Sequence, residues 1–152
     1  MIFLSLKGVG YSQNNFNIKD DKSKFELPFQ LVSDLVIIPV KLNGVELSFL
    51  LDTGVDSTIL FSLDKEDSLQ VENASVIYLR GIGEGDPIRA LKSTGNSLEI
   101  GESYSTDLSI YISFDYTMNL SNRLGIPVNG IIGYDYFKDF VLEFNYPKEK
   151  LT

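Results

Sequence analysis

The chain has 152 residues, 43% of them hydrophobic and 22% charged, which is the balance of a folded globular protein and a length that favours one domain. It contains neither Cys nor His, which excludes thiol nucleophiles, Ser-His pairs, disulfides and most zinc sites, so hydrolytic chemistry has to rely on carboxylates. The formal net charge of -8 disfavours nucleic acid and anionic membrane surfaces as partners.

The first 24 residues are predicted to form a leader in front of a domain at residues 25–152. Residues 1–6 are mainly apolar and residues 7–13 are mainly small or polar, as at the end of a signal peptide, but no basic segment precedes them. An ordinary hydrophobic N-terminal strand explains the same residues, and both interpretations stay open. Residues 14–24 are polar and lack a period, so we expect a loose segment. Export is slightly favoured over a cytoplasmic location, and no apolar run reaches the ~18 residues of a membrane span.

The strongest structural pattern is a β-hairpin. Residues 35–42 and 45–51 are rich in Val, Leu and Ile, and Asn43-Gly44 separates them. Asn-Gly accepts the positive φ angles of a type I′ turn, which is the turn that suits a two-residue hairpin. Two adjacent antiparallel strands are therefore predicted here.

The rest of the chain is also predominantly β in pattern. Short runs rich in β-branched and aromatic residues occur at 57–61, 74–79, 96–100, 108–112 and 140–146, each bounded by Gly, Asp, Ser, Asn or Pro. Helical patterns are limited to 116–124 and 134–139. This spacing predicts an all-β fold, a small closed barrel with one or two short helices.

One carboxylate stands out by its place in this pattern. Asp52 follows the apolar strand at 45–51 and precedes Thr53 and Gly54, so it is expected to be partly desolvated. Two such carboxylates within hydrogen-bonding reach share a proton, and one then serves as acid while the other serves as base. The tripeptide alone is also typical of an ordinary turn.

Three segments in the same order resemble the retropepsin-like aspartic proteases. The run from Leu50 to Leu60 is similar to the family's active-site strand, and the run from Asn129 to Phe137 is similar to its second signature, two apolar residues and a Gly before a short helix. Between them, residues 78–85 contain three glycines where the family has its flap, a hairpin over bound peptide. The resemblance covers roughly residues 36 to 146 and implies an acid-protease-like barrel that needs no metal or other cofactor.

The resemblance also implies roles for individual residues. Asp52 would be catalytic, with Thr53 and Gly54 supporting it; Thr53 would hydrogen-bond across a subunit interface. Substrate would contact Asp56 and the flap residues Gly81, Ile82 and Gly83. Two positions depart from the family: Tyr134 stands where retroviral relatives often have Arg, and Glu84 adds a charge to the flap. Asp135 is expected to be an N-terminal helix residue.

The expected function is metal-free hydrolysis of peptide bonds by an aspartic endopeptidase. Because the sequence contains a single Asp-Thr-Gly, the carboxylate pair requires a homodimer. Two alternatives stay open: an inactive retropepsin-like module that binds peptide or dimerises, and a monomeric enzyme that pairs Asp52 with Asp56 or Asp135. Residues 147–152 are predicted to turn into a further strand, and a longer natural chain with a C-terminal domain is compatible with that ending.

Overall fold

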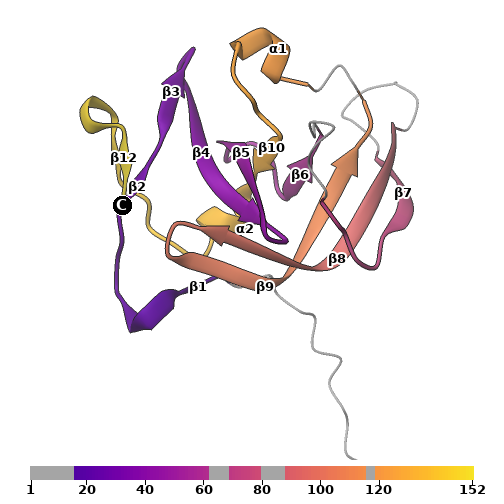
Figure 1. Ribbon diagram of the computed structural model, residues 1–152, viewed down its shortest axis with the longest axis horizontal. Coiled ribbons are helices and arrows are strands. Elements are labelled where there is room, and N and C mark those ends of the chain that lie inside the picture. The colour runs from indigo at the N-terminus through magenta and orange to yellow at the C-terminus, as the bar shows by residue number, and fades with distance from the viewer. Residues whose placement is uncertain (1–15, 62–68, 80–87, 116–118) are drawn as a thin grey trace, which may run out of the picture.

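The computed structural model describes residues 16–61, 69–79, 88–115 and 119–152. Figure 1 shows a large bent sheet, with a smaller sheet of β11, β12 and β2 at one side. The elements are β1 Asn17–Ile18, η1 Lys19–Asp21, β2 Leu27–Pro28, β3 Gln30–Val32, β4 Leu35–Leu42, β5 Val45–Leu51, β6 Thr58–Leu60, β7 Ser75–Leu79, β8 Ile88–Ile100, β9 Ser103–Ser113, α1 Ser121–Leu124, β10 Gly130–Ile132, α2 Tyr134–Phe137, β11 Phe144–Asn145, η3 Tyr146–Lys148 and β12 Lys150–Leu151. The described chain is therefore mainly β with two short α-helices, as predicted.

The large sheet is mixed and curls back on itself. Its strand order is β1-β9-β6-β10-β5-β4-β8-β7, with β3 on β4, and β8 pairs in addition with β9. The strands from β9 through β6, β10, β5 and β4 to β8 thus form a ring. The β4–β8 pairing is limited to Lys41↔Glu99 and Leu42↔Leu98, so the predicted barrel takes the form of a partial ring.

The β4–β5 hairpin has the predicted turn. Leu42 pairs with Val45, and Asn43 and Gly44 have φ angles of 46° and 85°. Both central residues thus have positive φ, as a type I′ turn requires. Local sequence was sufficient to predict this element.

Strand β8 is much longer than the predicted strand at 96–100, because it begins at Ile88. Its middle carries Gly95 with a φ of 76° and register shifts against β9 on both sides of Asn96. The buried Asn96 side chain donates to Ser93 Oγ at 2.9 Å and to the Leu108 carbonyl at 3.1 Å. Asn43 Nδ2 donates to Asn96 Oδ1 at 2.8 Å. Tertiary hydrogen bonds therefore hold a stretch that β propensity alone disfavours.

The C-terminal strand is shorter than the predicted run at 140–146, since only Phe144–Asn145 pairs as β11. Glu143 and Thr152 add one further pair of backbone hydrogen bonds. Phe140 packs against the core, while Val141 is 97% exposed. Residues 140–143 alternate between half-buried and exposed, but no described strand pairs with residues 140–142. The ending at 147–152 does enter a strand, β12.

Part of the predicted leader is packed onto the domain, unlike the loose segment expected from residue 14 onward. Phe16 is 6% exposed, and Asn17–Ile18 pairs with β9. The Phe16 ring lies edge-on to that of Tyr136, with centroids 5.0 Å apart, which anchors this arm from the far end of the chain. Residues 1–15, with the signal-peptide pattern, lie outside the described part. No helix in the described ranges is long and apolar enough to cross a membrane.

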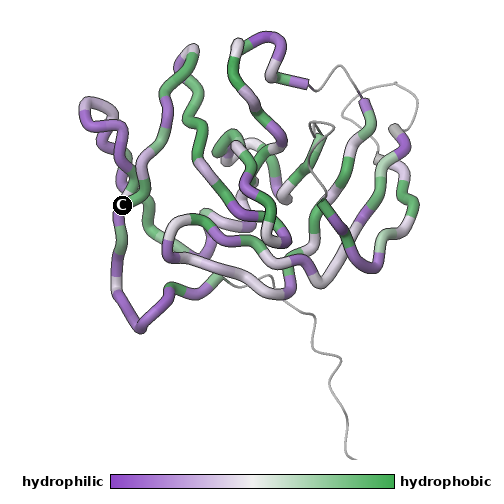
Figure 2. The backbone as a smooth tube through the Cα atoms, viewed as in Figure 1, coloured by the Kyte–Doolittle hydropathy of each residue, from purple (hydrophilic) through white to green (hydrophobic). Residues whose placement is uncertain are grey.

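Apolar side chains fill the interior of the ring. Figure 2 shows mostly hydrophobic residues (green) along β4 and hydrophilic residues (purple) at η1 and α1. The main cluster includes fully buried side chains from several strands, among them Phe49, Leu60, Leu98 and Ile132. A smaller cluster contains Ile37, Leu50, Val128 and Ile131. The two faces of β5 thus contribute to different clusters, and its carboxyl end is packed between them.

Candidate active site at the end of strand β5

Asp52 immediately follows β5, whose last residues Phe49 and Leu51 are 0% and 8% exposed. The Asp52 N–H donates to the Ile132 carbonyl at 3.0 Å, so β10 fixes the backbone where the carboxylate emerges. Asp52 itself is half-buried. A buried strand thus delivers one carboxylate to the protein surface at a defined place.

The Asp52 carboxyl group is oriented by the turn that follows it. Asp52 Oδ1 accepts a hydrogen bond from the Gly54 N–H at 2.8 Å, which is an Asx-turn. A Cβ atom at Gly54 would lie 3.1 Å from that oxygen, so a side chain there would crowd the carboxylate. Thr53, Gly54 and Asp56 are all exposed, and the loop leaves these groups accessible to a second molecule.

Strand β10 lies between the two strands that flank the Asp52 loop. It pairs in parallel with β5 and antiparallel with β6. A Cβ at Gly130 would lie 2.3 Å from the Ile59 carbonyl oxygen and 2.6 Å from the Phe49 ring. Only a residue without a side chain fits there, so Gly130 allows β10 to lie close to both neighbours.

Gly133 allows an equally close approach beneath the loop. A Cβ there would lie 2.3 Å from the Val55 carbonyl oxygen and 2.8 Å from both the N and O atoms of Ser57. The chain then enters α2, where the Tyr134 N–H donates to the Val55 carbonyl at 2.6 Å. The second predicted motif therefore supports the first through backbone contacts.

Asp135 lies in the first turn of α2, as expected. Its N–H donates to the Asp56 carbonyl at 3.1 Å, and its carboxylate lies 3.8 Å from the Lys138 ammonium. Asp135 thus holds the loop by its backbone.

Sequence reasoning assigned no role to Asn129, which ties β10 to β5. The Asn129 side chain is 5% exposed, and its Oδ1 accepts the Ser48 N–H at 2.9 Å. Its N–H donates to the Ser48 carbonyl at 2.7 Å, and its carbonyl accepts the Phe61 N–H at 2.9 Å. The available signal was a polar amide directly before an apolar strand, where a buried side chain needs backbone partners.

The flap residues Gly81, Ile82 and Gly83 lie outside the described residues. The strands on either side, β7 and β8, are antiparallel partners, and their last pair is Leu79↔Ile88.

No group of three or more Asp or Glu side chains that could hold a metal ion occurs within the described ranges.

Comparison with known proteins gives three findings. Residues 38–136 match the family model described as aspartyl protease. The retrovirus-related Pol polyprotein from transposon 412 of Drosophila melanogaster is 28% identical over 136 residues, which are 89% of this chain and 10% of that protein. The chain thus spans about a tenth of the length of that relative.

The third finding is a similarity of structure. The crystal structure of a retropepsin-like aspartic protease from Rickettsia conorii matches with a TM-score of 0.53 and 14% sequence identity, covering 84% of this chain and 86% of that chain. At this identity the likeness shows the fold alone, and it confirms the predicted retropepsin-like fold class.

Proposed function

The chain belongs to the aspartyl protease family, and from this premise we propose that it is an aspartic endopeptidase whose active site contains Asp52 from each of two identical subunits. The observation that carries the proposal is the half-buried carboxylate of Asp52, oriented by Gly54 at the end of a buried strand. Family membership supports peptide-bond hydrolysis as the reaction and a peptide or protein as the substrate.

The need for a second subunit follows from the chemistry. Peptide hydrolysis without a metal or covalent intermediate uses one carboxylate as base and a protonated one as acid. The sequence contains one Asp-Thr-Gly, so a symmetric dimer is the direct way to bring two equivalent carboxylates together. The exposure of Thr53 and Gly54 beside Asp52 is compatible with an interface at this loop.

In the proposed mechanism, a water molecule lies between the two Asp52 carboxyl groups. The ionised group removes a proton from the water, which attacks the scissile carbonyl carbon, while the protonated group donates to the carbonyl oxygen. The proton taken from water then passes to the departing amine. Gly54 contributes by holding the orientation of the carboxyl group, which is the requirement for such a pair to meet.

The supporting roles are proposed on the same premise. Thr53 would hydrogen-bond to the partner subunit. Asp56, whose carbonyl is held by the Asp135 N–H while the residue remains exposed, would bind the substrate backbone. Gly81, Ile82 and Gly83 keep their proposed role as substrate contacts.

The test is cleavage of a mixed peptide library at acidic and neutral pH, followed by mass spectrometry. Asp52→Asn should lower the rate by about a thousandfold or more, and a transition-state-mimicking aspartic-protease inhibitor should block the wild type. Asp34→Asn is the matched control, because Asp34 is an exposed turn residue with a φ of 62° that Asn also tolerates. Peptide binding without cleavage by the wild-type dimer would refute the enzyme and favour the inactive module.

A mixing experiment separates the dimer from an intramolecular carboxylate pair. With a ninefold excess of Asp52→Asn protein, about nine tenths of the wild-type subunits would have an inactive partner, so activity per wild-type subunit should fall to about a tenth. Unchanged activity would show that each chain works alone, by pairing Asp52 with Asp56 or Asp135.

A further inference from the structure

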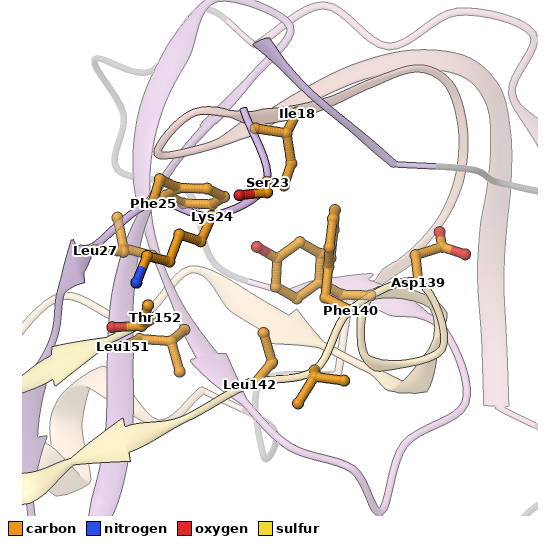
Figure 3. A pocket seen from close by; sticks show the side chains of 12 residues that line it. Ile18, Ser23, Lys24, Phe25, Leu27, Asp139, Phe140, Leu142, Leu151 and Thr152 are labelled. Carbon is orange, nitrogen blue, oxygen red and sulfur yellow. The ribbon is translucent and has the colours of Figure 1, made fainter. Parts of the chain in front are cut away.

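A pocket of about 300 Å³ lies between an N-terminal segment, residues 18–27, and a C-terminal segment, residues 136–152. Its volume is at the lower end of the range for small-molecule sites. Figure 3 shows side chains from both segments facing this space. Its walls are mainly apolar and include Phe25, Leu27, Phe140, Leu142 and Leu151. The loop that carries Asp52 contributes no lining residue, so the pocket is separate from the proposed active site.

Lys24 gives the pocket an available positive charge. Lys19, Lys22 and Lys150 form ion pairs with Glu99, Glu102 and Glu26, respectively. Among the residues that the structure describes, no carboxylate lies within ion-pairing distance of the Lys24 ammonium, although its charge acts on Glu26 at longer range.

Among the described lining residues, the one acidic side chain is on the opposite side from Lys24 (Figure 3). It belongs to Asp139, and its Oδ2 accepts the Phe16 N–H at 2.9 Å. The pocket therefore has apolar walls, a cation at one side and an already hydrogen-bonded anion at the other.

We propose that this pocket binds a medium-chain fatty-acid anion. The alkyl chain would lie against Phe25, Phe140 and Leu142, because apolar surface gains from leaving water. The carboxylate would accept a charge-assisted hydrogen bond from the Lys24 ammonium, whose aliphatic stem lines the pocket while its head stays hydrated. A neutral alcohol of the same length would gain only the burial of its alkyl chain, and an alkylammonium would be repelled by the Lys24 ammonium.

Isothermal titration calorimetry on the full chain tests this proposal, with decanoate, decanol and decyltrimethylammonium each below its micelle concentration. We expect decanoate to bind most tightly. Lys24→Gln should weaken decanoate binding about tenfold and leave decanol unchanged. Lys148→Gln is the charge-matched control, because Lys148 is exposed and does not line the pocket.

A second pair of variants keeps the test independent of folding defects. Leu142→Asp should abolish binding of decanoate and decanol alike, with its folded state checked by circular dichroism. Because the chain has no Trp, Val141→Trp places a single reporter at the pocket, and its emission should shift to the blue on binding.

The proposal is overturned if decanoate does not bind, if decanol binds equally well, or if Lys24→Gln changes nothing. Decanoate binding that appears only after Leu4→Asp would show that the N-terminal apolar segment fills the pocket instead. A dimer that dissociates in Leu142→Asp, seen by sedimentation, would assign the pocket to a second copy of the chain.

Discussion

Gly133→Ala is expected to displace the loop that carries Asp52. The added Cβ would lie 2.3 Å from the Val55 carbonyl oxygen, about 1 Å short of the 3.4 Å at which ordinary contact begins. The other close atoms, N and O of Ser57 at 2.8 Å, also belong to the backbone and cannot rotate away. Gly133 has a φ of -94°, which Ala adopts freely. The substitution therefore adds a steric clash without adding backbone strain.

The loss of unfolding free energy in Gly133→Ala has two sources, the steric clash and the weakened hydrogen bonds to the loop. Overpacking against fixed atoms costs about 1–3 kcal/mol, and weakening the hydrogen bonds from Tyr134 and Asp135 to the loop costs about 1 kcal/mol each. A total of about 4 kcal/mol would lower Tm by roughly 8–16 °C for a chain of this size. A loop shift of about 1 Å at Asp52 should also reduce the proposed peptidase activity about a hundredfold.

Gly125→Ala is the matched control for this experiment. Gly125 has a φ of 71° and no atom within 4 Å of an added Cβ, so Ala there introduces backbone strain of about 1 kcal/mol and no clash. Urea unfolding followed by circular dichroism measures both variants. A Gly133→Ala protein that is no less stable than Gly125→Ala would show that the predicted clash does not exist.

Three further substitutions test other parts of the fold. Thr58 is 1% exposed and its Oγ1 has no hydrogen-bond partner among the described residues, so Thr58→Val should raise the unfolding free energy by about 1 kcal/mol; a loss measured in urea would contradict this. Burial raises the pKa of the Tyr136 hydroxyl, and the hydrogen bond with Ser103 opposes that shift. The pKa of Tyr136 in the folded state therefore exceeds the unfolded value of about 10. The stability that the neutral hydroxyl contributes is fully present below pH 10 and is lost as the pH rises through the raised pKa. Tyr136→Phe should therefore flatten the decline of the unfolding free energy with pH in alkaline denaturation. Asn96→Ala should cost about 3 kcal/mol in thermal unfolding, because it leaves buried partners unpaired, whereas Asn122→Ala at an exposed helix position should be close to neutral.

The features that the sequence determined by itself are those that depend on near neighbours. The Asn43-Gly44 turn needs only two residues that tolerate positive φ, and the apolar runs on either side of it set the β4–β5 hairpin. The place of Asp52 at the end of β5 follows from the same run. The order of the motifs was enough to predict the family and the fold class.

Tertiary structure decided what those motifs contact. Asn129 contacts Ser48 across 81 positions of the chain, and Phe16 contacts Asp139 across 123. Strand β8 continues through a Gly because Asn96 finds partners on β9 and in the β4–β5 turn. Phe140 and Leu142 pack against the core, although no described strand pairs with them. Periodicity records which side of a strand is apolar and carries no information about which distant strand will lie next to it. The support beneath Asp52 and the pocket beside Lys24 are both built from such distant pairs, so only the folded chain could reveal them.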